Sequence, residues 1–505
     1  MEKIKRLLKV KRIIPALIVI AGLIVLGYFL LPNFKSGSGK NNGNVNNEQS
    51  IAVLPFVNMS NDPAQDYFSD GLTDGILNSL AHLQGLKVCA RSSSFQFRGK
   101  DVDIKEVGKK LNVRTVLEGS IQLQGDRIRI TAQLINVEDG HHSWSEQYDE
   151  KMDDIFALQN KIANAIAEKL EITLLEGHKM LAKNPTTSKE AYELYLKGRS
   201  FWNLRTPPDL KKGIDFFQQA IALDPSYAAA YSGIADCYTA LGYGSFLSPK
   251  ESFPKALEAA TKALALDSTL AEPHASLGFY KFYYDWDWAA AEQEFRIAIA
   301  LNQNYELGYD WYGYYLTAMK RYDEAAVILK KARDLSPLSV PISTDMGFSL
   351  YYSGNYDQAL KELQSSIKMN PKFGLGHLWS GRVYQEKKMY KQSIEEYEKT
   401  LLASPGWPVA FAALGNVYGI MGEKEKAREI LDTLSVLSKT KFVTSYGVAL
   451  VYAGLGEKDK AFEWINKAYD ERSNWLVWLK SDPRWSPISS DKRFAELVHR
   501  VGLPN

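Results

Sequence analysis

The sequence predicts a mainly α-helical chain of 505 residues, with one transmembrane helix, a small α/β domain and a solenoid of about eight helix pairs. Three observations lead to this fold class. An uncharged apolar run covers residues 13–31, short apolar and alternating runs fill residues 51–175, and helix-ending motifs recur through residues 191–474. These patterns are typical of a membrane span, of strands alternating with helices, and of stacked helical repeats, respectively.

The charge balance and the cysteine count narrow the class of function. Lys and Arg number 61 against 59 Asp and Glu, a net charge of +2. The first twelve residues alone carry +5, which leaves −3 on the rest of the chain. We therefore expect no nucleic-acid partner, because a near-neutral body does not follow a phosphate backbone. Two cysteines are too few for a disulfide scaffold or a Cys-rich metal site.

The N-terminal region divides into a basic arm (1–12), a transmembrane helix (13–32) and a flexible linker rich in Gly, Ser and Asn (33–50). The uncharged run spans about 28 Å as a helix, close to the thickness of a bilayer core. A cleaved signal peptide is the alternative, but no small-x-small cleavage site follows the run. The basic arm predicts a cytoplasmic N-terminus, with the bulk of the chain across the membrane.

Residues 51–175 alternate between strand-like and helix-like patterns. Ile128 and Ile130 alternate with Arg127 and Arg129, as in a half-buried strand, and Gln124-Gly125-Asp126 is typical of a hairpin turn. The predicted order is β-α-β-α-β-β-β-α, an α/β layer with a partly antiparallel sheet. The expected strands are 51–59, 86–90, 113–123, 127–137 and 140–148, and the expected helices are 66–83, 104–111 and 153–175.

We predict no catalytic, cofactor or metal site among the polar side chains of this domain. Asp70 and Asp74 share a helix face that we expect to be solvated, and His141 and His142 are adjacent on a strand, so they point to opposite faces. No G-x-S-x-G turn is present for a Ser nucleophile. Residues 91–94 follow a predicted strand, where ligands often bind, although a polar loop satisfying its own backbone is the alternative. We predict a second partner contact at Arg91, Ser92, Ser93 and Phe95.

Six motifs make residues 51–175 resemble the TolB-like N-terminal domain. They are IAVLPF (51–56), YFSDGLT (67–73), ARSSSFQFRGK (90–100), VLEGS (116–120), ITAQLINVEDG (130–140) and DIFALQ (154–159). In many bacterial proteins this domain is linked to tetratricopeptide repeats and to a class III adenylate cyclase or a CadC-like winged helix. We find neither output domain in this sequence. The resemblance implies a bacterial protein and brings no agreed catalytic residues. Together with the apolar run and the basic arm, it leads us to expect a single-pass inner-membrane protein with its bulk on the periplasmic or extracytoplasmic side.

Several markers repeat at a spacing of 34 residues in the second half of the chain. Helix ends recur at Leu301, Leu335, Met369, Ala403 and Leu437, and small residues recur at Gly313, Gly347, Gly381, Gly415 and Ala449. Such a period identifies tetratricopeptide repeats, in which the small residue lets helix A approach helix B. We expect a connector at 176–190, the solenoid at 191–474 and a tryptophan-rich cap at 475–505.

The A helices of the solenoid are expected to line a concave groove. Aromatic residues recur at the groove positions of three consecutive repeats, so we predict an exposed aromatic stripe that binds a partner. The alternative is that these rings pack against neighbouring repeats. The predicted groove residues are Phe279, Phe282, Tyr283, Tyr314, Phe348, Tyr351, Tyr352 and Arg382.

The sequence thus predicts a membrane-anchored, non-enzymatic scaffold or sensor without a cofactor, binding a protein or peptide through the repeat groove. The TolB-like domain is expected to supply a second contact. The alternative is a signalling component of an adenylate-cyclase-like or transcriptional-regulator system without its output domain. The sequence leaves the partner and the oligomeric state open.

Overall fold

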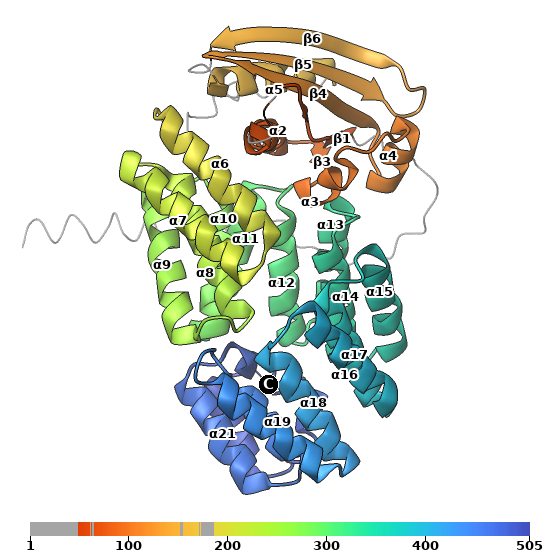
Figure 1. Cartoon of the computed structure of the whole chain (residues 1–505), viewed down its shortest axis with the longest axis vertical. Helices are drawn as coiled ribbons and strands as arrows, with labels where there is room; N and C mark the ends of the chain where they lie inside the picture. Colours follow the sequence, from red (N-terminus) through yellow and green to blue (C-terminus); the bar gives the residue numbers. More distant parts are fainter. Residues whose placement is uncertain are drawn as a thin grey trace, which may run out of the picture. The chain divides into compact units, whose positions relative to one another are not determined.

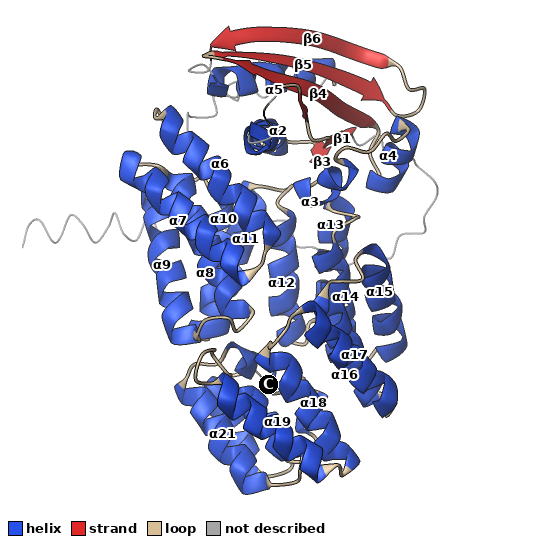
Figure 2. Ribbon diagram, in the orientation of Figure 1, coloured by secondary structure: helices blue, strands red, loops and turns tan. Residues whose placement is uncertain are grey.

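A six-stranded mixed sheet forms the first part of the computed structural model (Figures 1 and 2). The structure describes residues 49–60, 62, 65–151, 155–170, 172 and 186–504. The strand order is β3-β1-β4-β5-β6, with β2 paired to β4. The strands are β1 (Gln49–Val53), β2 (Val57–Asn58), β3 (Leu86–Val88), β4 (Thr115–Gln124), β5 (Arg127–Asn136) and β6 (His142–Lys151).

The sheet is parallel on one side of β4 and antiparallel on the other. β1 pairs in parallel with β3 and β4, whereas β4, β5 and β6 form an antiparallel meander. The expected hairpin at residues 124–126 joins β4 to β5, as predicted. The first predicted strand is shorter than expected, because Pro55 has no N–H for a ladder and β1 ends at Val53.

Helices cover both faces of the sheet. In β1, Ile51 and Val53 belong to the core beneath α2 (Asp66–Ala81) and α5 (Ile155–Lys169), whereas Ala52 belongs to a second core. That second core is closed by α4 (Ile104–Leu111). Two short helices that the sequence did not predict, α3 (Arg91–Ser94) and η2 (Phe95–Phe97), follow β3.

The repeat region of the described chain contains the eight predicted helix pairs. Their helices are α6 (Lys189–Leu204), α7 (Pro207–Leu223), α8 (Ala228–Tyr243), α9 (Pro249–Leu266), α10 (Ala271–Tyr280), α11 (Trp288–Leu301), α12 (Glu306–Ala318), α13 (Tyr322–Leu335), α14 (Val340–Tyr352), α15 (Tyr356–Met369), α16 (Gly374–Glu386), α17 (Tyr390–Ala403), α18 (Pro408–Met421), α19 (Lys424–Leu437), α20 (Ser445–Gly454) and α21 (Lys458–Asp470). A π-turn, η4 (Lys281–Asp285), follows α10, and the C-terminal cap contains η5 (Asn474–Trp478), η6 (Pro483–Trp485) and α22 (Lys492–Val501).

The periodic glycines lie where the two helices of a repeat meet, which confirms the repeat register. A Cβ atom built on Gly313 or Gly347 would lie 2.5 Å from a side-chain atom of Leu329 or Leu363 on the following helix. The turn glycine Gly354 has φ of 80°, a left-handed conformation that costs an L side chain energy.

The sheet domain and the first repeats share one hydrophobic core. α2 lies between the sheet and the repeat helices (Figure 1), and Leu196 of α6 fills the space where a Cβ on Gly71 would sit. Gln159 Nε2 of α5 donates to the Tyr192 hydroxyl of α6 over 2.8 Å. The predicted boundary between the two domains is therefore bridged by continuous packing.

Polar contacts join the sheet domain to the middle repeats as well. Asn304 Nδ2 donates to the backbone oxygens of Ala81 (2.9 Å) and Leu86 (3.0 Å), and its Oδ1 accepts from the Val88 amide at 2.9 Å. The Ala90 amide donates to Leu335 O at 2.8 Å. The Asn304 bonds satisfy backbone groups at the end of α2 and on β3, which lies at the edge of the sheet.

The predicted membrane location requires correction. In residues 49–60, 65–151, 155–170 and 186–504, no helix combines the length and the apolar character needed to cross a bilayer. Even the apolar helix α18 covers only Pro408–Met421, too few turns to span a hydrocarbon core. This finding contradicts the predicted location as a single-pass inner-membrane protein with a periplasmic or extracytoplasmic body. The arm 1–12, the predicted helix 13–32 and linker residues 33–48 lie outside the described residues.

The contact at Gly347 gives a direct test of the repeat register. Gly347→Leu is expected to lower the free energy of unfolding by about 1–3 kcal/mol, because the new side chain would overlap Leu363. The matched control is Val327→Leu, at an exposed position of α13. This control is expected to change the free energy of unfolding by only about 0.5 kcal/mol or less. Chemical denaturation measures both variants, and equal free energies of unfolding would contradict the repeat register.

Candidate functional site

The predicted aromatic stripe is not exposed. Each of its seven rings exposes 5% or less of its surface, and all of them belong to the core of the repeats. The expectation of an exposed stripe is therefore wrong for Phe279, Phe282, Tyr283, Tyr314, Phe348, Tyr351 and Tyr352. Whether any of these rings contacts a partner remains a prediction.

Trp478 of the C-terminal cap covers most of these rings. Its indole stacks on Tyr352, with ring centroids 4.5 Å apart and 12° between the planes. It also meets Phe348 and Phe282 edge-on, at 4.9 and 6.1 Å. The chain thus places its own tryptophan on the aromatic surface that the sequence assigned to a partner.

A buried polar network holds the cap in this position. Arg484 Nη2 pairs with Asp482 Oδ2 at 2.6 Å, and the Tyr446 hydroxyl donates to the same carboxylate at 2.8 Å. Trp485 Nε1 in turn donates to the Tyr446 hydroxyl. Because the ion pair is buried and multiply hydrogen-bonded, loss of one member would leave an uncompensated charge in the core.

The cap also reaches back to the second repeat. Trp475 Nε1 donates to Ser245 Oγ (3.1 Å), and Asn474 Nδ2 donates to Tyr243 O (3.2 Å). Trp407 Nε1 donates to Gly244 O in the same turn. These contacts connect the turn after α8 to the C-terminal cap and to the start of α18.

Arg382, the predicted polar groove residue, is also buried. It exposes 2% of its surface, and its guanidinium lies 4.2 Å from the Trp379 ring centroid and 5.0 Å from that of Trp475. Nε and Nη1 have no hydrogen-bond partner among the described residues. Burial lowers the pKa of Arg382, and contact with two indole faces compensates part of the cost of the buried charge.

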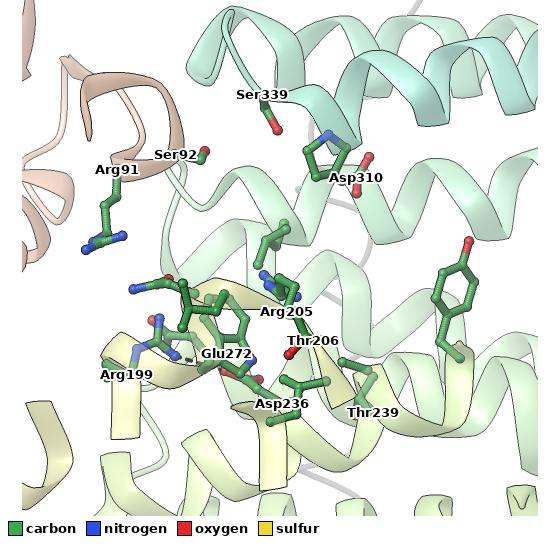
Figure 3. A pocket seen from close by; sticks show the side chains of 18 of the residues that line it. Arg91, Ser92, Arg199, Arg205, Thr206, Asp236, Thr239, Glu272, Asp310 and Ser339 are labelled. Atoms are coloured by element: carbon green, nitrogen blue, oxygen red, sulfur yellow. Dashed lines mark hydrogen bonds and ion pairs between the residues drawn. The ribbon is translucent and has the colours of Figure 1, made fainter. Parts of the chain in front are cut away.

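An open cavity of about 1770 Å³ lies between the sheet domain and the concave side of the repeats (Figure 3). Two predicted groove residues, Phe279 and Tyr314, line it. Three residues of the predicted second contact, Arg91, Ser92 and Phe95, line it from α3 and η2, whereas Ser93 does not. The structure therefore brings parts of both predicted sites to one cavity.

Ser92 and Ser93 serve contacts within the chain itself. Their hydroxyls lie 2.7 and 2.8 Å from Ser336 Oγ, and the Leu338 amide donates to Ser93 Oγ. The expectation of a loop that bonds only to its own backbone is therefore wrong. These serines dock the sheet domain on the turn after α13.

Arg91 is fixed by two carboxylates of α2. Its Nε donates to Asp74 Oδ2 at 2.9 Å, Nη2 lies 3.4 Å from Asp70, and the guanidinium lies 3.7 Å from the Phe95 ring centroid. The prediction that Asp70 and Asp74 form a solvated face is wrong, because α3 brings Arg91 onto them. Arg91 thus presents a positioned cation to the cavity, and Phe95 presents an aromatic ring.

A second cationic group lines the cavity at the end of α6. The Trp202 ring contacts the guanidinium of Arg199 at 4.3 Å and that of Arg205 at 3.5 Å. Arg199 also pairs with Asp236 of α8 at 3.2 Å. Burial raises the pKa of Asp236 to about 6 even beside this arginine.

Four carboxylates from three A helices form an acidic wall of the cavity. Glu272 of α10, Glu306 and Asp310 of α12, and Asp345 of α14 line it. Burial raises the pKa of Glu306 to about 6 and that of Asp345 to about 7, and burial beside Asp345 raises the pKa of Asp310 strongly. Hydrogen bonding between the two carboxyl groups raises the pKa of Asp310 and lowers that of Asp345, and hydrogen bonding to Tyr314 also lowers the pKa of Asp345.

Sequence reasoning missed these carboxylates, although the repeat period carried a signal for them. Glu272 and Glu306 occupy equivalent turns of consecutive A helices, as do Asp310 and Asp345. Acidic residues recurring near the repeat period on A helices would have pointed to one wall of the concave side. The predicted groove site was instead assigned to the aromatic residues at neighbouring positions.

Two family models match parts of the chain. Residues 47–165 match the second domain of HilA/YgeH-like transcriptional regulators, and residues 316–378 match a tetratricopeptide repeat. The repeat assignment is thereby confirmed. The TolB-like identity suggested by the sequence motifs is not shown, since the matching model of the sheet domain is the HilA-like one.

Two bacterial proteins are similar to the chain over part of their length. A protein of Rhizobium meliloti (strain 1021) named "Putative adenylate cyclase 3" is 39% identical over 190 residues, covering 37% of this chain and 32% of that protein. The transcriptional regulator HilA of Salmonella typhimurium is 23% identical over 339 residues, covering 65% of this chain and 53% of HilA. The chain thus spans about a third to about half of these curated relatives.

A solved structure of IFIT1 with m7Gppp-AAAA aligns with a TM-score of 0.43 at 16% identity, covering 63% of this chain and 77% of IFIT1. YrrB, described as a TPR protein with an unusual peptide-binding site, aligns with a TM-score of 0.26 at 20% identity, covering 37% of this chain and 92% of YrrB. These likenesses assign no function to the chain.

Truncation of a covered ring tests whether it belongs to the core. Tyr351→Ala is expected to lower the free energy of unfolding by about 3–5 kcal/mol, because the ring is 1% exposed. Tyr351→Phe is the matched control, since the buried hydroxyl has no partner among the described residues. This control should change the free energy of unfolding by only about 0.5 kcal/mol or less. Wild-type melting of Tyr351→Ala would mean that the ring is not part of the core.

Proposed function

We propose that the chain is a non-enzymatic protein-binding scaffold that holds a segment of a partner protein in the cavity between the sheet domain and the repeats. The observation that carries the proposal is the division of the concave side. Trp478 contacts four rings of the aromatic stripe, whereas a cavity of about 1770 Å³ beside them stays open. The proposed site therefore lies beside the rings that Trp478 contacts, and it includes Phe279 and Tyr314 of the predicted stripe.

The size and lining of the cavity support a polypeptide ligand. Pockets for drug-sized molecules measure roughly 300–1,000 Å³, so this space accommodates a larger ligand. Its walls combine aromatic faces, such as Trp311 and Trp407, with charged groups such as Arg91 and Asp310. Aromatic side chains supply contact area at low entropic cost, while positioned polar groups fix the register of a bound segment.

The sheet domain contributes one wall, in keeping with its predicted role as a second contact. Phe95 and Arg91 line the cavity from this domain, and Arg91 is held by Asp74. A segment in the cavity would touch both domains at once. Its binding would therefore be sensitive to changes in either of them.

A second candidate is a regulatory module of a signalling system. It is favoured by the HilA-like model over residues 47–165 and by the relative named as an adenylate cyclase. Cyclase and DNA-binding assays on the full chain test this candidate. Activity in either assay would replace the scaffold as the primary function, and inactivity in both is the result that the scaffold predicts.

A site-specific crosslink tests the scaffold proposal. Phe246 lines the cavity and is 36% exposed, so a photoreactive p-benzoylphenylalanine at this position should crosslink a partner in intact cells. The same amino acid at Leu402, which is 81% exposed on α17 outside the cavity, is the matched control. The scaffold predicts a discrete crosslinked species at position 246 that is absent at position 402.

A cavity-filling variant shows whether that species depends on the cavity. Ala229→Trp places a large ring at a half-buried lining position, and it should abolish the crosslink at position 246 while the protein melts near the wild-type temperature. Equal crosslinking from both positions, or a crosslink that survives Ala229→Trp, would contradict a partner site in the cavity.

A further inference from the structure

The charges of Arg199 and Arg205 partly offset the raised pKa of Glu306, and that of Arg205 partly offsets the raised pKa of Asp310, but neither arginine forms a direct ion pair with the acidic wall in the described structure. Glu272, Glu306, Asp310 and Asp345 come from three successive A helices, and within the described residues none of them forms an ion pair. Carboxylates that share a partly enclosed space raise each other's free energy unless a cation joins them. The wall therefore lacks a directly paired cation in the described structure.

One acceptor on this wall is left without a donor. Asp310 exposes 2% of its surface and lines the cavity, and its Oδ1 has no hydrogen-bond partner in the described part of the chain. Its carboxyl group is held by the bond to Asp345, which the Tyr314 hydroxyl also contacts. A buried acceptor that is rigidly placed and unpaired is destabilising, and a donor from a ligand would recover that loss.

Two of the arginines that line the cavity are bonded to carboxylates outside the acidic wall. Arg91 is bonded to Asp74, and Arg199 is paired with Asp236. Arg205 lies 3.5 Å from the Trp202 ring centroid and makes no ion pair in the described structure. Figure 3 shows Arg199, Arg205, Asp236, Glu272 and Asp310 around the same space.

We propose that this acidic wall binds the charged nitrogen of a lysine or arginine side chain carried by the partner segment, with Asp310 and Asp345 as its principal acceptors. The proposal rests on the scaffold function and specifies the chemistry of the bound segment. An ammonium or guanidinium group supplies a directly paired positive charge for the wall and an N–H donor for Asp310 Oδ1. The aliphatic stem of such a side chain can lie against Trp311 at the cavity wall.

This mode of binding has a pH signature. A bound cation favours the charged carboxylates, so it lowers the raised pKa values of Asp310 and Asp345 and displaces the proton that they share. Affinity should therefore rise between pH 6 and pH 8, around the pKa of about 7 for Asp345, with release of a proton. The titratable or charged groups that face the pair are Glu306 and Tyr314 of α12, Tyr243 of α8, Tyr283 of η4 and Arg205 at the end of α6.

Calorimetric titration of the full chain with short peptides tests the proposal. The probe is a capped five-residue alanine peptide with a central lysine, and its matched control carries the uncharged isostere norleucine. At pH 8 the lysine peptide, and an arginine version, should bind at least about tenfold more tightly than the norleucine peptide. An alanine peptide with a free N-terminus shows whether a chain terminus is recognised instead, which would overturn the assignment to a side chain.

Variants connect this preference to the named carboxylates. Asp310→Asn combined with Asp345→Asn should reduce the preference for lysine to less than about twofold and remove its pH dependence. Glu398→Gln, an exposed acid on α17 outside the cavity, should leave both unchanged. Because the pair is buried, the melting temperature of the double variant is measured first, and Asp345→Asn alone serves if the double variant is unfolded.

Failure of this inference is distinguishable from failure of the scaffold function. Equal binding of the lysine and norleucine peptides, or binding of neither, overturns the acidic-wall proposal. If the crosslink at Phe246 persists in that case, the cavity holds a partner by other contacts. If that crosslink is absent as well, the scaffold function fails with it.

Discussion

The arrangement of the described chain depends on the close approach of α2 and α6. Gly71 has no side chain, and Leu196 fills the space that a Cβ would take, so the first repeat helix packs into the core of the sheet domain. Dense packing of this kind resists displacement, because a shift of even a methyl group opens a void. The sheet domain is thereby held against the repeats, and Asn304 adds a polar contact on the far side of the cavity.

Two consequences for binding follow from this constraint. With the sheet domain fixed, α3 faces the concave side of the repeats and encloses the cavity together with the A helices. At the other end, the C-terminal cap covers the aromatic surface with Trp478. The cavity is therefore lined by aromatic, cationic and acidic side chains, and within the described residues the acidic wall makes no direct ion pair.

The regular features of this fold could be predicted from sequence, and the contacts between distant segments could not. The 34-residue period placed Gly347 at the contact between two helices, and strand alternation placed β5 correctly, because both patterns are local. The burial of Tyr352 depends on Trp478, and the ion pair of Asp74 depends on the turn that aims Arg91. No local sequence pattern predicts these contacts, because they join residues that are distant in the sequence. The acidic wall is an intermediate case. The spacing of Asp310 and Asp345 near the repeat period is visible in the sequence, but only the folded structure shows that neither forms an ion pair with another described residue.

Amide hydrogen exchange at Val88 tests the central claim, that the sheet domain is fixed on the repeats and encloses the cavity with them. This amide donates to Asn304 Oδ1 at 2.9 Å across the boundary between the domains. The account predicts exchange as slow as at Val116 in the centre of the sheet, and an increase of at least about tenfold in Asn304→Ala. Fast exchange at Val88 in the wild-type chain, with Val116 still protected, would show that the domains move independently and that the enclosed cavity does not persist in solution.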